Sequence, residues 1–171
     1  MELSKSIILI GMPGCGKSTV GKILAKKYKA RFVDTDNLIK TRIGTKLQDY
    51  IDTYGRDEFL NEEHRTIMEL FPEEPWIIAT GGSVVLNEES MKHLKEIGTV
   101  VFLDADLPLL TKRLWNVGTR GIVFADGDTD GIRGVYAERE PLYYKHSDIR
   151  VHVRGKTPED TAEFIIKKAG N

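Results

Sequence analysis

The sequence contains little that is typical of a secreted or membrane-bound protein. Its 171 residues include a single cysteine, Cys15, so no disulfide can form within the chain. No apolar run approaches the ~20 residues that a membrane-spanning helix needs. Residues 1–6 carry two charges and lead straight into an apolar run, which is not a signal-peptide pattern. We therefore expect a cytoplasmic protein in a reducing compartment.

Net charge is almost absent as well. The chain has 25 basic and 26 acidic residues, which leaves a formal charge of -1 and no overall attraction to nucleic acid or to an anionic membrane. Its length suits one compact domain with one sizeable core. We expect a monomeric single domain over residues 1–171 that binds neither nucleic acid nor membrane.

Strand and helix patterns alternate along the chain. Short apolar, β-branched runs predict strands at 7–10, 31–33, 76–79, 100–103 and 149–153. Apolar residues at helical spacing predict helices at 17–28, 36–43, 55–70, 88–97 and 108–115, part of 136–144, and a last helix capped by Thr157. Alternating elements of this kind are typical of an α/β fold with a parallel five-stranded sheet between two layers of helices.

A glycine-rich motif follows the first expected strand. The residues Gly11-Met12-Pro13-Gly14-Cys15-Gly16-Lys17-Ser18 fit the phosphate-loop pattern G-x-x-x-x-G-K-[ST], and an amphipathic helix follows them as the pattern requires. In such a loop the backbone N–H groups and the helix N-terminus hold phosphate oxygens. Lys17 would reach the β- and γ-phosphates as a catalytic residue, and the Ser18 hydroxyl would ligate Mg²⁺. The expected ATP-binding residues here are Gly11, Gly14, Cys15, Gly16, Lys17, Ser18 and Thr19.

Two carboxylates follow the second expected strand. Asp34 and Asp36 lie at its carboxyl end, which is the ligand-binding edge of an open parallel sheet. One carboxylate could hold Mg²⁺ and the other could accept the proton of an attacking hydroxyl. Alternatively, Asp36 could simply cap the helix that follows. The residues alone leave both interpretations open.

The ordered motifs resemble the shikimate kinase family over nearly the whole chain. The resemblance rests on the phosphate loop, Asp34-Thr35-Asp36, the spacing Gly55…Phe59…Glu63, Thr80-Gly81-Gly82, Arg113 seven residues before Arg120, and Arg139-Glu140-Pro141-Leu142-Tyr143. A phosphate loop alone is common to many nucleotide-binding proteins, whereas the ordered set is much more specific. The resemblance implies a P-loop kinase fold with a helical acceptor-binding segment at about 34–64 and a closing lid at about 114–131.

The resemblance also implies a role for each matching residue. Asp34 would organise Mg²⁺ with Ser18, and Asp36 would bind the ring hydroxyls of the acceptor and act as the catalytic base. Arg113 would lie under the adenine, and Arg120 of the lid would approach the transferring phosphate as a catalytic residue. The acceptor would contact the remaining matched residues, which are Glu63, Gly81, Gly82 and Arg139, the last through its carboxylate.

Three positions depart from the family pattern. The family motif Phe-Arg-x-x-Glu has a leucine here, Leu60, in place of its arginine. The third glycine of Gly-Gly-Gly is Ser83, and the lid motif Arg-Pro-Leu-Leu reads Arg120-Gly121-Ile122-Val123. Losing one of two charge-assisted arginine contacts would weaken acceptor binding ~10–100-fold. Arg56, one helical turn before Leu60, is either a replacement cation or an ordinary surface residue.

We therefore expect an ATP- and Mg²⁺-dependent kinase that phosphorylates a small polyhydroxylated acid, with shikimate and its 3-phosphate as the leading substrate and product. Two alternatives remain. The acceptor could be another polyol acid or a nucleoside monophosphate, or the chain could be a nucleotide-binding regulator without catalytic activity. The intact Lys17, Ser18, Asp34 and Asp36 argue against the regulator.

Overall fold

The chain folds around a parallel sheet. The computed structural model describes residues 2–113 and 131–169, and within them five parallel strands form one sheet in the order β2-β3-β1-β4-β5. In chain order these are β1 (Ser6–Ile10), β2 (Arg31–Asp34), β3 (Trp76–Ala79), β4 (Gly98–Asp104) and β5 (Ile149–His152). The expected fold class is confirmed. Strand β1 is central and every one of its residues is buried, because helices cover both faces of the sheet.

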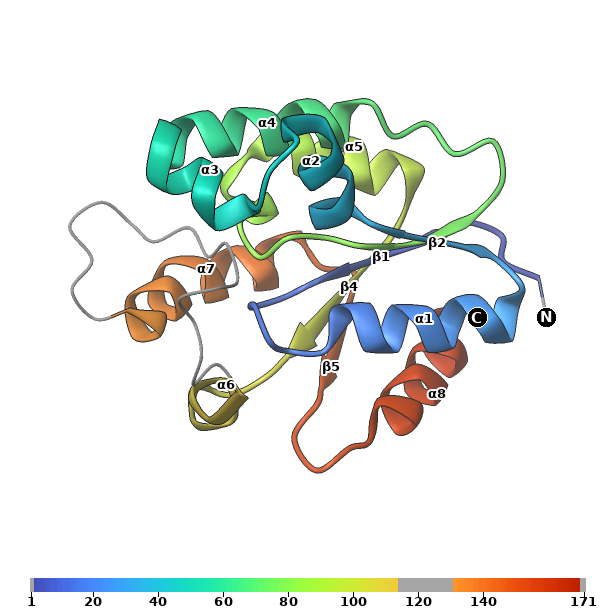
Figure 1. The fold of residues 1–171 in the computed structure, drawn as a ribbon. Helices are drawn as coiled ribbons and strands as arrows, with labels where there is room; N and C mark the ends of the chain where they lie inside the picture. The colour runs from blue at the N-terminus through green and yellow to red at the C-terminus, as the bar shows by residue number, and fades with distance from the viewer. Residues whose placement is uncertain (1, 114–130, 170–171) are drawn as a thin grey trace.

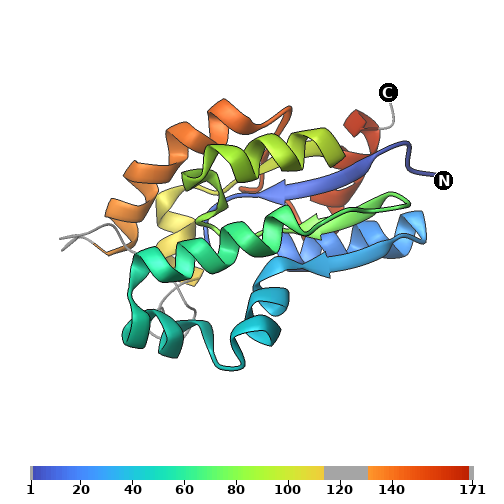
Figure 2. The same ribbon diagram turned by 90° about the horizontal axis from the view of Figure 1, so that it is seen from above.

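The helices form the two outer layers (Figures 1 and 2). Helices α1 (Lys17–Tyr28) and α8 (Pro158–Ala169) cover one face, and α4 (Arg56–Met68), α5 (Glu88–Ile97) and α7 (Ile132–His146) cover the other. The shorter helices are α2 (Thr35–Ile43), α3 (Leu47–Tyr54), α6 (Leu107–Arg113) and the 3-10 turn η1 (Val84–Leu86). Helix α8 begins as expected, because Thr157 Oγ1 accepts a hydrogen bond from the N–H of Asp160, and the Asp160 carboxylate accepts one from the N–H of Thr157. No helix of the described part of the chain is long and apolar enough to cross a membrane.

Helices α2, α3 and α4 pack around a small apolar cluster of their own. Its fully buried members are Ile39 and Phe59, and the partly buried residues around them are Ile43, Leu47, Tyr50, Ile51 and Leu60. This cluster is separate from the main core that lines the sheet. The segment corresponds to the acceptor-binding region expected at about 34–64. Helix α3 was not predicted, and residues 114–130, which hold Arg120 and nearly all of the expected lid, lie outside the described residues.

Candidate functional site

The phosphate loop connects β1 to α1. Gly11 has φ +148°, and a Cβ atom there would lie 2.7 Å from the Leu103 carbonyl oxygen, so a side chain is excluded for both conformational and steric reasons. Gly16 has φ +103° and is the N-cap of α1. Lys17 is buried, and its Nζ donates hydrogen bonds to the carbonyl oxygens of Gly11 (2.7 Å) and Met12 (2.9 Å). The loop therefore holds a cation beside the free N–H groups of a helix N-terminus.

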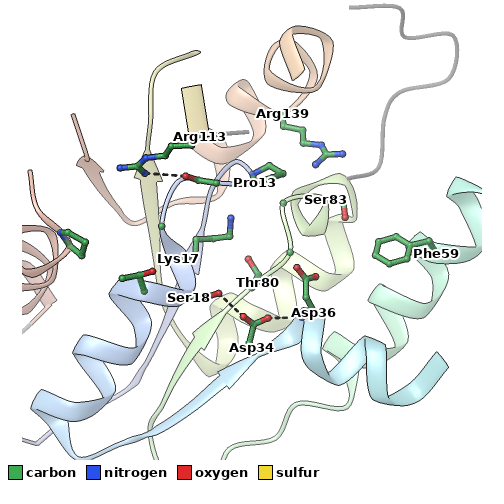
Figure 3. A pocket seen from close by; sticks show the side chains of 16 residues that line it. Pro13, Lys17, Ser18, Asp34, Asp36, Phe59, Thr80, Ser83, Arg113 and Arg139 are labelled. Atoms are coloured by element: carbon green, nitrogen blue, oxygen red, sulfur yellow. Dashed lines mark hydrogen bonds between the residues drawn. The ribbon is translucent and has the colours of Figure 1, made fainter. Parts of the chain in front are cut away.

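A cavity of about 660 Å³ opens beside this loop. Figure 3 shows Lys17 near its centre, Arg113 on one side, and Asp36, Phe59 and Arg139 on the other. The carboxyl ends of β2 and β3 contribute the acidic and glycine-rich segments of its wall. The lining residues are Pro13, Gly14, Gly16, Lys17, Ser18, Thr19, Asp34, Asp36, Phe59, Thr80, Gly81, Gly82, Ser83, Arg113, Arg139 and Pro158.

Asp34 joins the phosphate loop to α2. Its Oδ2 accepts a hydrogen bond from the Ser18 hydroxyl at 2.6 Å, and its Oδ1 accepts one from the backbone N–H of Asp36 at 3.0 Å. Asp34 is thus the N-cap of α2, and the alternative that Asp36 caps this helix is wrong. Capping by Asp34 leaves the Asp36 carboxylate available to face the cavity (Figure 3).

Asp36 is an unusually basic aspartate. Burial, and then the charge of Asp34, raise its pKa to about 6, while the ammonium of Lys17 acts in the opposite direction. A carboxylate with this pKa is still ionised at neutral pH and binds a proton more readily than an ordinary aspartate. Such a group is suited to accept a proton from a hydroxyl.

Glu63 lies behind the same part of the wall. It is buried on α4, and its Oε1 accepts a hydrogen bond from the Ser83 hydroxyl at 2.7 Å. Burial raises its pKa most strongly, the Ser83 hydrogen bond lowers it, and the result is about 7. A Cβ atom at Gly81 would lie 2.7 Å from both Glu63 Oε2 and Asp36 Oδ1. A side chain at position 81 would therefore displace one or both carboxylates.

Arg139 brings a buried guanidinium to the side of the cavity on which Asp36 and Phe59 lie (Figure 3). Only 1% of the residue is exposed, and Glu138 Oε1 lies 3.7 Å from its Nε. The neighbouring Tyr143 hydroxyl donates a hydrogen bond to the Gly82 carbonyl at 2.6 Å, which ties α7 to the glycine turn after β3. Arg56 contacts the same Glu138, at 3.4 Å, and does not line the cavity. Its role as a replacement cation stays a prediction.

Arg113 lies at the other side of the loop. Its Nη1 donates a hydrogen bond to the Gly14 carbonyl at 3.1 Å, which places the guanidinium over the loop from the end of α6. Pro158, the first residue of α8, lines the same cavity. The two side chains come from segments far apart in the sequence and line the same cavity.

The structure brings most of the sequence-predicted residues together. Gly14, Gly16, Lys17, Ser18, Thr19, Asp34, Asp36, Gly81, Gly82, Arg113 and Arg139 all line the cavity. Three of the predicted residues, Gly11, Cys15 and Glu63, lie behind the wall of the cavity and do not line it. A fourth, Arg120, lies outside the described residues. Sequence reasoning had not assigned site roles to Pro13, Phe59, Thr80, Ser83 and Pro158. Thr80 and Ser83 could have been found because they follow β3 at the ligand-binding edge of the sheet.

Comparisons with known proteins place the chain among small-molecule kinases. The family model described as shikimate kinase matches residues 13–169. A curated shikimate kinase of Thermodesulfovibrio yellowstonii is 37% identical over 164 residues, which cover 96% of this chain and 94% of that protein.

Solved structures give the same result. The shikimate kinase of Acinetobacter baumannii in complex with shikimate has a TM-score of 0.87 at 26% identity, covering 96% of this chain and 92% of that one. The shikimate kinase of Aquifex aeolicus has a TM-score of 0.82 at 30% identity, covering 96% of each chain.

Proposed function

This chain belongs to the shikimate kinase family of ATP-dependent small-molecule kinases, and we propose that it transfers the γ-phosphoryl group of ATP to shikimate, forming shikimate 3-phosphate. The observation that carries the proposal is one continuous cavity in which Lys17 lies between the nucleotide-side Arg113 and the acceptor-side Asp36 and Arg139 (Figure 3). ATP bound at one end of the cavity and the phosphoryl acceptor bound at the other would meet at Lys17.

The nucleotide occupies the loop end in this proposal. Gly14 and Gly16 give the backbone the curvature that directs N–H groups at the phosphates, with Thr19 beside them at the start of α1. Lys17 exchanges its loop carbonyls for the β- and γ-phosphate oxygens, where negative charge builds in the transition state. Arg113 and Pro158 contact the adenine.

Ser18 and Asp34 suit a magnesium ion. A hydroxyl oxygen and a carboxylate lie 2.6 Å apart beside the phosphate loop, and oxygen atoms are the ligands that Mg²⁺ prefers. Mg²⁺ usually takes one or two protein ligands together with phosphates and waters, so no cluster of three carboxylates is required. When bound, the ion would neutralise charge on the transferring phosphate.

Shikimate occupies the opposite end. Arg139 binds the acceptor carboxylate through a charge-assisted contact, and the backbone at Gly81 and Gly82 packs closely against the ring. Asp36 accepts the proton of the attacking hydroxyl as the oxygen bonds to phosphorus. Its raised pKa improves the proton transfer.

The same proposal assigns the remaining parts of the molecule. Residues 1–171 form one kinase domain that works as a monomer in the cytoplasm, without nucleic acid or a membrane as a partner. The acceptor-binding segment spans about 34–64, and the lid spans about 114–131, where Arg120 would approach the transferring phosphate.

A panel of acceptors tests the proposal. The purified protein is given ATP, Mg²⁺ and, in turn, shikimate, a second polyhydroxylated acid or a nucleoside monophosphate, and ADP release is measured. We expect release that depends on shikimate. Asp36→Asn should lower turnover ~10²-fold or more, since a positioned base contributes 10²–10⁴-fold. Asp57→Asn, at an exposed position of α4, serves as the control.

Two results would contradict the proposal. Release stimulated only by another compound would keep the kinase and change the acceptor. Tight ATP binding without release on any acceptor would favour a nucleotide-binding regulator instead.

A further inference from the structure

The contact between Ser83 and Glu63 ties the glycine turn after β3 to helix α4. The Ser83 hydroxyl donates to Glu63 Oε1 at 2.7 Å, and both residues are buried. Ser83 also lines the cavity, whereas Glu63 lies just behind it. A hydroxyl at the cavity wall thus fixes the orientation of a carboxylate that has no other hydrogen bond among the described residues.

The second oxygen of Glu63 is buried, and no residue of the described ranges 2–113 and 131–169 donates a hydrogen bond to it. This atom, Oε2, has almost no contact with solvent. A buried acceptor left unpaired is costly, and the cost is greater for a charged group. A donor supplied from the cavity would remove that cost.

The position of Oε2 shows where such a donor would bind. Glu63 Oε2 and Asp36 Oδ1 each lie 2.7 Å from the place that a Cβ atom of Gly81 would occupy. Gly81 lines the cavity, and so does Asp36. The two oxygens therefore lie close together beside Gly81, and neighbouring hydroxyls of a ring bound there could donate one hydrogen bond to each.

We propose that Ser83 is a positioning residue for the acceptor, because its hydroxyl holds Glu63 with Oε2 beside Asp36 to accept a hydrogen bond from a second acceptor hydroxyl. This inference rests on the proposed function. Asp36 binds the 3-hydroxyl, which is phosphorylated, and Glu63 binds the adjacent 4-hydroxyl. Without the Ser83 hydroxyl, Oε1 also loses its donor, and the carboxylate is free to rotate about its terminal bond.

Steady-state kinetics with substrate analogues tests this role. Ser83→Ala should raise the KM for shikimate about tenfold, the equivalent of one hydrogen bond to a charged group. We expect kcat and the KM for ATP to stay within about threefold of the parent values. The lost contact would stabilise bound shikimate equally in the ground state and in the transition state, so its loss raises KM alone. With 4-deoxyshikimate, the parent and Ser83→Ala should have equal KM values. With 5-deoxyshikimate the tenfold difference should persist.

Two further variants complete the test. Ser90→Ala is the matched control. Ser90 is a buried serine of α5 that does not line the cavity, and its hydroxyl contacts a residue of α4, as the Ser83 hydroxyl does. The contact is with His64 Nδ1, at 2.8 Å. Ser90→Ala should leave the KM for shikimate unchanged. Glu63→Gln keeps the size of the side chain. It should raise the KM for shikimate and leave the KM for 4-deoxyshikimate equal to that of the parent, so it tests the role even if Ser83→Ala does not fold.

The outcomes separate the two proposals. Shikimate turnover by the parent with an unchanged KM in Ser83→Ala would contradict the positioning role alone. A KM increase that is equal for shikimate and 4-deoxyshikimate would show a merely structural effect and would also overturn it. Absence of shikimate turnover by the parent would contradict the proposed function, and this inference would fall with it.

Discussion

Asp36 and Glu63 are two carboxyl groups at the end of the cavity that we propose holds the acceptor. Asp36 is half-buried and lines the cavity, whereas Glu63 is buried behind its wall. The pKa of Asp36 rises to about 6 through burial and the charge of Asp34. The pKa of Glu63 rises further, to about 7, because burial outweighs the Ser83 hydrogen bond and the opposing charges of Arg139 and Lys17. Asp36 is thus largely ionised at neutral pH, whereas Glu63 is close to half protonated. Burial thus raises the pKa of both groups, and it does so more strongly for the fully buried Glu63.

The raised pKa of Glu63 has a consequence for folding. In the unfolded chain its pKa returns to about 4.5, so between these values the folded protein binds more protons than the unfolded chain. The free energy of unfolding therefore falls as pH rises from 4.5 to 7, by up to about 3 kcal/mol from this group.

Glu63→Gln should remove this dependence. The free energy of unfolding of the variant minus that of the parent should increase by roughly 1–3 kcal/mol from pH 5 to pH 8. Urea denaturation at both pH values measures this change. Glu74→Gln, at an exposed position, should show no such gain. A Glu63→Gln effect that is the same at both pH values would mean that Glu63 is ionised throughout the range.

At the scale of elements, local signals predicted the sheet and the phosphate loop well. The five strands and the loop before α1 follow from continuous apolar runs and glycine spacing. Helix α3 was missed because it is only eight residues long, which is shorter than the segments in which a helical pattern is usually recognised. The Ser83–Glu63 contact could not be predicted, since it depends on how α4 packs against the turn after β3. The motif indicated Glu63, but its hydrogen bond to Ser83 depends on packing that no short motif encodes.

Helix α4 connects the two apolar clusters. Phe59 and Leu60 near its start pack in the small cluster, while Ile67 near its end belongs to the main core, and Glu63 lies between them. Leu60 occupies the position at which the family motif has an arginine. It precedes Glu63 by three residues, so a cation there would share a helix face with the carboxylate.

Leu60→Arg should strengthen shikimate binding. We expect the KM for shikimate to fall ~10-fold, because a charge-assisted contact is worth about 1.5–3 kcal/mol. Loss of the Leu60 side chain from the small cluster should lower the melting temperature by a few degrees at the same time. Asn61→Arg, on the exposed side of α4, adds the same charge and should change neither quantity. A parent that phosphorylates another compound, with shikimate inactive in both proteins, would contradict shikimate as the acceptor.

At the scale of the whole molecule, the two clusters differ greatly in size. The main core extends across both faces of the sheet and includes β1, β4 and the inner sides of α1, α5 and α8. The small cluster under α2 and α3 has only Ile39 and Phe59 fully buried. Segments with few buried apolar contacts open locally at a lower free energy than the global unfolding reaction. We therefore expect the part of the cavity proposed to hold the acceptor to rest on a less stable part of the molecule than the phosphate loop does.

Hydrogen exchange should separate these two parts. Without ligands, amides of α2 and α3 should exchange at least ~10-fold faster than those of β1 and β4, since they open without global unfolding. Shikimate should slow exchange in α2, α3 and the first half of α4, because Asp36 and Phe59 line the acceptor end and tie the segment to the bound ligand. A non-hydrolysable ATP analogue should instead slow exchange at the start of α1 and leave α3 unchanged. Equal exchange rates in α3 and β4, or equal protection of both by shikimate, would mean that the two clusters unfold as one unit.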